Sequence, residues 1–96
     1  PEWYWNQLAV ALYADRQYEE SIRANEHGER PGQFWYLARM AACHAQLGRS
    51  EQARALVAEV LRRKPDFRYS AVDLSFRDPE DAAHVIDGFR KAGLPG

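Results

Sequence analysis

Apolar and small side chains recur at helical spacing in two separate stretches of the chain. In each stretch, four positions step by three, one and three residues: Trp5, Leu8, Ala9 and Leu12, then Leu37, Met40, Ala41 and His44. That spacing brings the four side chains onto one face of a helix. The pattern therefore predicts two amphipathic helices, whose equivalent residues lie 32 positions apart, as Trp5 and Leu37 do.

A second amphipathic segment follows each of these predicted helices. The first copy carries Tyr18, Ser21, Ile22 and Asn25, and the second carries Ala53, Leu56, Val57, Val60 and Leu61. Gly48 suits the turn between the second pair of helices, and Pro31 and Pro65 close the two copies. Small residues are expected to face each other within each pair, so that its helices approach closely: Ala9 opposite Ser21, and Ala41 opposite Ala53.

The stretch from residue 78 to residue 95 carries the signals of a helix start and a helix end. Asp78 stands at the N-cap position, and Pro79 has the φ that the first helical residue needs. Gly93 suits the left-handed position after the last turn. We therefore predict a helix from Pro79 to Ala92, docked through the apolar stripe of Ala82, Val85, Ile86 and Phe89 on the second helix pair.

These elements predict an all-α fold with two antiparallel helix pairs in a short right-handed superhelix. The expected units are residues 1–66, divided into pairs of about 2–33 and 34–66, then a linker of residues 67–78 and a capping helix with its tail at 79–96. The linker is too apolar for solvent, so we expect it to pack on the second pair, with a short helix from Ser70 to Ser75. Its apolar residues are Phe67, Tyr69, Val72, Leu74 and Phe76.

Composition narrows the class of protein without naming a function. The net charge of −1 divides into −3 for residues 1–32, +4 for 33–65 and −2 for 66–96, and so mild a polarity predicts no nucleic-acid partner. Cys43 is the only cysteine, which leaves no intrachain disulfide and favours a cytoplasmic setting. No apolar run approaches the roughly 20 residues of a membrane helix, so no membrane partner is expected. The first residue is Pro1 rather than Met, which indicates a piece of a longer protein.

Aromatic residues begin both first helices and suggest a surface for recognising proteins or peptides. Trp5 and Phe34 are expected in the core, whereas Trp3 and Trp35 are expected to face the concave side of the superhelix. A partner-binding groove there would be lined by Trp3, Asn6, Val10, Tyr13, Trp35, Ala38, Arg39, Ala42 and Gln46. That lining has few cations, which argues against capture of a terminal carboxylate. The uncovered aromatic face at the N-terminal end is a candidate homodimer interface.

Asp81, His84 and Asp87 are the candidates for a metal site or an acid-base site. They form a slanting row on the predicted C-terminal helix, and three ligands on one exposed stretch of helix make a poor metal site. The main alternative is that they form a solvated helix face. Cys43 and His44 adjoin on a helix, so their side chains diverge by about 100° and form no nucleophile-base pair. We therefore expect no catalytic residues, no metal and no cofactor.

The chain resembles tetratricopeptide repeats through L-G-R-S-E-Q-A (residues 47–53) and K-P-D (residues 64–66), although Pro31 comes two residues early in the first copy. With the closing F-R-D-P-E-D-A-A-H-V-I-D-G-F-R-K-A-G-L-P (residues 76–95), it resembles the C-terminal tetratricopeptide region of bacterial class III adenylate/guanylate cyclases, particularly those of rhizobia. The resemblance implies a non-catalytic regulatory module that binds proteins or other domains of its parent chain. Similar tails occur on other bacterial signalling and transcriptional regulators.

Overall fold

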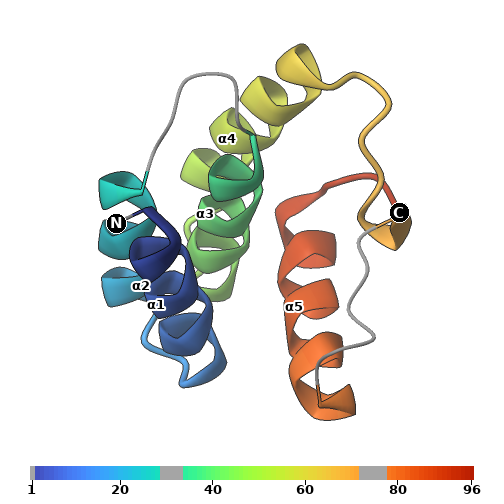
Figure 1. Cartoon of the computed structure of the whole chain (residues 1–96). Helices are drawn as coiled ribbons and strands as arrows, with labels where there is room; N and C mark the ends of the chain where they lie inside the picture. The colour runs from blue at the N-terminus through green and yellow to red at the C-terminus, as the bar shows by residue number, and fades with distance from the viewer. Residues whose placement is uncertain (1, 29–33, 72–77) are drawn as a thin grey trace.

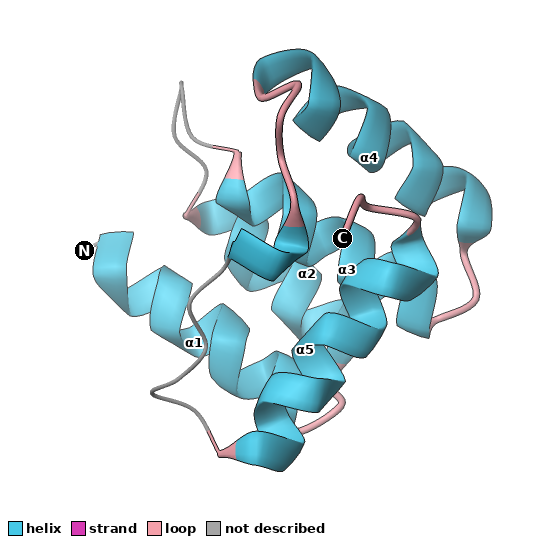
Figure 2. Cartoon of the chain, turned by 90° about the vertical axis from the view of Figure 1, so that its right-hand side faces the viewer, coloured by secondary structure: helices cyan, strands magenta, loops and turns pink. Residues whose placement is uncertain are grey.

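The chain folds into helices, joined by short connections. The computed structural model describes residues 2–28, 34–71 and 78–96, with the side chains of residues 2, 3 and 71 left aside. The described elements are α1 (Glu2–Ala14), α2 (Tyr18–His27), α3 (Trp35–Gln46), α4 (Ser50–Arg63), the 3₁₀ helix η1 (Tyr69–Ala71) and α5 (Pro79–Ala92). The described ranges contain no strand (Figure 2). The prediction of an all-α fold is confirmed.

Helices that follow each other in the chain pack on each other. α1 packs on α2, α2 on α3 and α3 on α4 (Figure 1). α5 lies along α3, and it also contacts α4 and α1. The right-handed superhelix and its tetratricopeptide geometry remain predictions.

The turns that join α1 to α2 and α3 to α4 have the same backbone structure at an offset of 32 residues. Gln17 N donates to Leu12 O over 2.9 Å, and Arg49 N donates to His44 O over 2.8 Å. The φ and ψ angles of Gln17 are −93° and 69°, while those of Arg49 are −91° and 71°. The repeat detected in the sequence is thus a repeat of backbone conformation.

One position in these turns takes a left-handed conformation in both copies. Gly48 has a φ of 77°, as its place in the sequence predicts, and Arg16 has a φ of 61° at the equivalent position. A residue with a Cβ adopts this region at a cost of about 1 kcal/mol relative to glycine. The first turn therefore keeps the shape of the second without the residue that suits it best.

Small residues allow close packing inside both helix pairs. Ala9 and Ser21 are buried between α1 and α2, and the Ser21 hydroxyl donates to the Ala9 carbonyl over 2.7 Å. Ala41 and Ala53 are buried at the equivalent positions of α3 and α4. A hydroxyl that bonds a carbonyl of the neighbouring helix also satisfies a buried polar group, so Ser21 fits this contact without a penalty.

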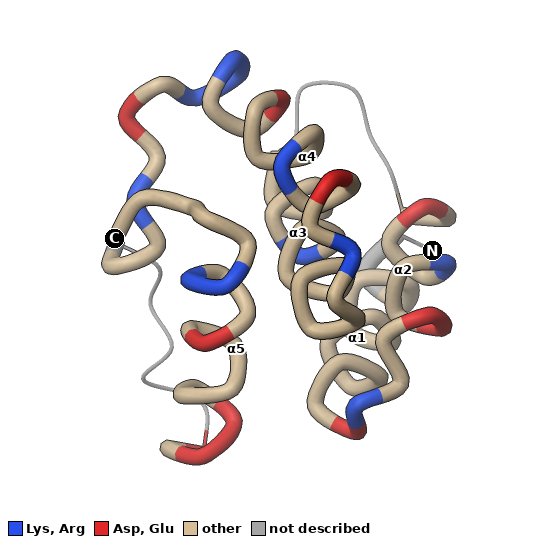
Figure 3. The backbone as a smooth tube through the Cα atoms, turned by 180° about the vertical axis from the view of Figure 1, so that it is seen from behind, with Lys and Arg blue, Asp and Glu red and all other residues tan. Residues whose placement is uncertain are grey.

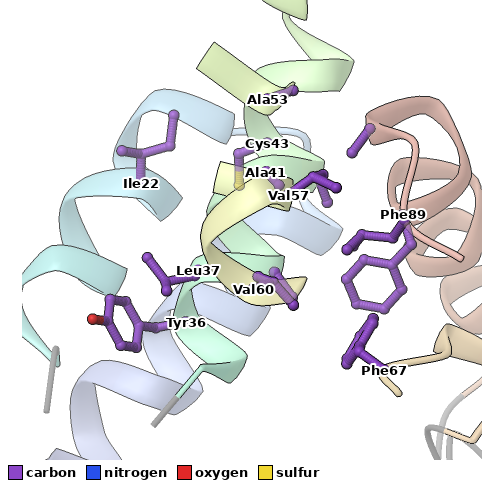
Figure 4. Packing of buried hydrophobic residues seen from close by; sticks show 14 of the residues in the cluster. Ile22, Tyr36, Leu37, Ala41, Cys43, Ala53, Val57, Val60, Phe67 and Phe89 are labelled. Atoms are coloured by element: carbon purple, nitrogen blue, oxygen red, sulfur yellow. The ribbon is translucent and has the colours of Figure 1, made fainter. Parts of the chain in front are cut away.

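The main hydrophobic core lies where α3, α4, α5 and the segment after α4 meet. Figure 4 shows Phe67 and Phe89 pointing toward the side of α4 that carries Val57 and Val60. Phe67 and Val60 are among the largest fully buried side chains. Burial of one such side chain stabilises the fold by about 1.5–3 kcal/mol. The residues after α4 are thus part of the core, while residues 72–77 of the predicted linker lie outside the described residues.

The two ends of α5 have the caps that the sequence predicts, and the helix spans Pro79–Ala92 as expected. The Asp78 carboxylate accepts from Glu80 N over 2.9 Å, and Gly93 has a φ of 94°. Figure 3 shows acidic residues at the first turn of α5 and basic residues near its last turn, which suits the helix dipole. Tyr69 N then donates to Pro95 O over 2.8 Å, so the end of the chain lies beside η1.

Three expectations about single positions need correction. Trp5, expected in the core, is half-buried and stacks on the ring of His27 with centroids 4.5 Å apart. Asn25, which takes the place of an apolar residue, is 2% exposed and hydrogen-bonded. The short helix expected from Ser70 to Ser75 is a 3₁₀ turn, Tyr69–Ala71, in the part of this segment that the structure describes.

Candidate partner-binding site

The predicted groove residues divide into a covered and an uncovered set. Tyr13, Ala38 and Ala42 are buried, and Ala38 is 0% exposed. Trp35 is 41% exposed, and Asn6 is exposed on α1. Val10, Arg39 and Gln46 are half-buried, and Trp3 is among the side chains left aside.

α5 covers the part of the predicted groove that lies near the ends of α1 and α3. The Tyr13 hydroxyl donates to the His84 carbonyl of α5 over 2.8 Å. Gln46 Nε2 of α3 donates to the Tyr13 hydroxyl over 3.2 Å and to Asp87 Oδ2 over 3.3 Å. At these three positions α5 itself occupies the groove that the sequence assigns to a partner.

His84 is held between two tyrosines, which corrects the expectation of a solvated helix face. The His84 ring lies 4.5 Å from the Tyr13 ring, measured between centroids, and its Nε2 lies 2.7 Å from the Tyr18 hydroxyl. Burial lowers the pKa of His84, and the positive charge of Arg16 lowers it further. The neutral imidazole is therefore the form that this site favours.

Asp87 is the acidic centre of a small hydrogen-bonded network on α5. Its carboxylate lies 3.1 Å from Lys91 Nζ and accepts from Arg90 over 2.9 Å. Lys91, and then Arg90, lower the pKa of Asp87 to about 2. Lys91 also donates to Gln46 Oε1 over 3.1 Å, so this network joins α5 to α3.

Asp81, His84 and Asp87 do not come together as a ligand set. In the described ranges, no group of three or more His, Cys, Asp or Glu side chains could hold a metal ion. His84 and Asp87 instead bond Tyr18 and Gln46 respectively. These residues attach α5 to the rest of the fold, so the geometry gives no support to a metal site there.

The buried polar residues between α1, α2 and α3 form a relay that the sequence did not reveal. Asn25 Nδ2 donates to Ser21 O over 3.0 Å, and Arg39 Nε donates to Asn25 Oδ1 over 2.9 Å. Arg39, expected to line the groove, thus has its Nε directed into the helix interface. In the described part of the chain, His44 Nδ1 is buried without a hydrogen-bond partner, and burial lowers the pKa of His44.

Aromatic side chains remain accessible at the opposite ends of α1 and α3. Tyr4 is 48% exposed, beside the half-buried Trp5. Trp35 packs against Phe34 and Phe67, with ring centroids 4.6 Å and 5.7 Å away, and keeps part of its indole exposed. The exposed part of the predicted groove is therefore aromatic and weakly polar.

Neither Cys43 nor the helix lengths add a further kind of site. Cys43 is fully buried, and this burial raises the pKa of its thiol to about 11. A thiol with so high a pKa is a weak nucleophile at neutral pH. Among the described helices, none has the length and apolar character to cross a membrane.

Comparisons with known proteins add no relative: no family model matches the chain, and no curated protein or solved structure matches it.

Proposed function

We propose that this chain is a non-catalytic module for protein-protein interaction, built from two tetratricopeptide-like helix pairs. The observation that carries the proposal is the repeated turn. Gln17 and Arg49 close the two turns with equivalent hydrogen bonds and equal backbone angles, 32 residues apart. Stacked helix pairs of this kind build extended surfaces on which partners bind.

The partner surface that we propose for the docked state of α5 combines the uncovered groove positions. Asn6 and Trp35 are exposed there, and Val10 is half-buried. Trp and Tyr side chains supply much of the binding energy at protein interfaces because they bury a large area with few rotatable bonds. A protein or peptide with an apolar side chain opposite Trp35 fits this surface.

Photocrosslinking tests this surface with a matched control. A photoreactive residue at Asn6 is expected to crosslink one partner from the native cell, whereas the same group at Arg54, exposed on α4, is not. Trp35→Ala is expected to abolish the Asn6 crosslink, and Leu47→Ala, at another exposed apolar side chain, to retain it. Equal crosslinking from Asn6 and Arg54, or no effect of Trp35→Ala, contradicts the proposal.

We further propose that the parent protein is a class III cyclase, which rests on the tail resemblance over residues 76–95. The module then regulates cyclic nucleotide synthesis and carries none of the catalytic residues. Deletion of residues 1–96 from the parent is expected to change nucleotide cyclisation or its regulation while the catalytic domain stays folded. A parent without a cyclase domain overturns this part and leaves the alternative, the tail of another bacterial signalling or transcriptional regulator.

The aromatic face at Tyr4 supports one second candidate, a homodimer of the isolated chain. Tyr4 is among the exposed large hydrophobic residues, and it lies edge-on to Trp5 with ring centroids 5.2 Å apart. Sedimentation at rising concentration is expected to show a dimer that Tyr4→Lys disrupts. A wild-type chain that stays monomeric over the whole range contradicts it.

A further inference from the structure

α5 fits its neighbours through a glycine. A Cβ added to Gly88 would collide with the Tyr13 hydroxyl and lie 2.9 Å from the Ala42 Cβ. Real Cβ atoms do not come so close, so the α5 backbone reaches this depth only with glycine at the contact. Tyr13 and Ala42 thus form a notch that admits the backbone of a helix and excludes a side chain.

The residues beside Gly88 complete a recognisable helix surface. Asp87, one residue before it, accepts from Gln46 Nε2. Phe89, one residue after it, is 3% exposed in the core. One groove therefore selects three consecutive positions of a helix: an acid, a glycine and an aromatic residue.

The two halves of α5 are held differently. Its buried residues are Gly88, Phe89 and Ala92, all in the second half of the helix. The first half is held through hydrogen bonds to Tyr13 and Tyr18, which water can replace at small net cost. A competing helix can therefore begin to enter at the first half of α5.

We propose that the groove formed by Tyr13, Ala42 and Gln46 is a helix-binding site, that α5 is its resident ligand, and that a partner protein binds there by replacing α5 with a helix of its own. The partner helix carries glycine at the notch, with an acid before it and an aromatic residue after it. This inference deepens the proposed interaction function and rests on it. It adds that α5 controls access to one half of the predicted groove.

A peptide exchange experiment on the full chain tests this proposal. The probe is a fluorescein-labelled peptide of residues 78–96, measured by anisotropy. Wild-type chain is expected to bind it weakly because its own α5 competes. Gly88→Ala in the chain forces the resident helix outward, so the chain is expected to bind the native probe at least about tenfold more tightly. A probe with Gly88→Ala is expected to bind that same chain at least about tenfold more weakly, although alanine favours the helix.

Matched controls separate the notch from helix propensity and from unfolding. Ala83 is exposed on α5, so Ala83→Ser in the chain or in the probe is expected to leave binding unchanged. Tyr13→Phe removes the hydroxyl that the new Cβ would meet, so a chain with this change is expected to discriminate less between the native and Gly88→Ala probes. Circular dichroism establishes whether the Gly88→Ala chain keeps its helices.

Two outcomes overturn the proposal: equal binding of the native and Gly88→Ala probes, or no binding of the native probe to a folded Gly88→Ala chain. If that variant does not fold, probe discrimination by wild-type and Tyr13→Phe chains decides the matter. The probe comes from this chain, so the result does not depend on finding a cellular partner. Failure of the crosslinking experiment and failure of the exchange experiment are therefore distinguishable.

Discussion

The Tyr18 hydroxyl lies 2.7 Å from His84 Nε2 and joins the start of α2 to the middle of α5, across 66 residues of sequence. Tyr13 stacks on the same imidazole and bonds the His84 backbone carbonyl. His84 is thus a point at which α5 is attached to the first helix pair. Its protonation state bears on how firmly α5 is docked.

Acidification is expected to weaken the docking of α5. Burial and Arg16 lower the pKa of His84 below its ordinary 6.5, and Lys91 adds to this, while Asp87 and Asp81 oppose it. The unfolded chain therefore binds the proton first as the pH falls, and stability is lost from about 6.5 downward until the folded pKa is reached. Urea unfolding at pH 7.5 and 5.5 is expected to show a smaller loss in His84→Gln than in wild type.

His44 shares this direction, because burial also lowers its pKa, so only the difference between the two chains reports on His84. An NMR titration of the His84 ring gives an independent check, with a midpoint expected below 6.5. A midpoint at or above 6.5, or the same pH dependence in both chains, contradicts the prediction.

Asn25→Ala is expected to lower the free energy of unfolding by about 1–3 kcal/mol, because it leaves the Arg39 Nε–H bond without its acceptor in a helix interface. Chemical denaturation measures the change. Glu26→Ala, at the exposed neighbour, is expected to stay within about 0.5 kcal/mol of wild type. Equal effects of the two substitutions would show that the relay adds no stability.

Cys43 is expected to resist thiol reagents in the folded chain. At pH 8, a pKa of about 11 in place of 9.0 lowers the thiolate fraction by about a hundredfold, and burial restricts access further. Reaction with a disulfide reagent, followed by absorbance, is expected to be slow in buffer and fast in concentrated urea. Similar rates in the two solutions contradict the buried position.

Phe67→Ala is expected to cost about 3–5 kcal/mol, since the side chain is fully buried in the core. The Phe67 ring packs 5.7 Å from the Trp35 indole, so the emission of Trp35 is also expected to shift to longer wavelength. Arg68→Ala changes an exposed neighbour and serves as the control. A neutral Phe67→Ala would show that the segment after α4 packs only loosely.

The sequence predicts well those features that depend on near neighbours in the chain. The bounds Pro79–Ala92 follow from a cap, a proline and a glycine that act within one turn of the helix. The turn at Gly48 follows in the same way from one residue that tolerates a positive φ. Arg16 in the equivalent conformation could not be predicted from its own residue type, only from its offset of 32 residues from Gly48.

Features that depend on contacts between distant residues were only partly predictable. An apolar stripe shows which face of α5 is buried, but not that Gly88 would lie against Tyr13 as well as Ala42. Asn25 departs from the apolar pattern, yet its partner Arg39 looked like a residue of an open groove. His84 offered no signal for its two tyrosine partners, because they lie 66 and 71 residues away in the sequence.

The long connection between Tyr13 and His84 also orders the events of folding. The two turns close within a few residues of their helices, whereas α5 bridges 71 residues to reach Tyr13. Contacts between distant parts of a chain form late, because a larger loop must close before they contribute. The helix pairs are therefore expected to assemble first, and the attachment of α5 to set the slowest step of the folding rate.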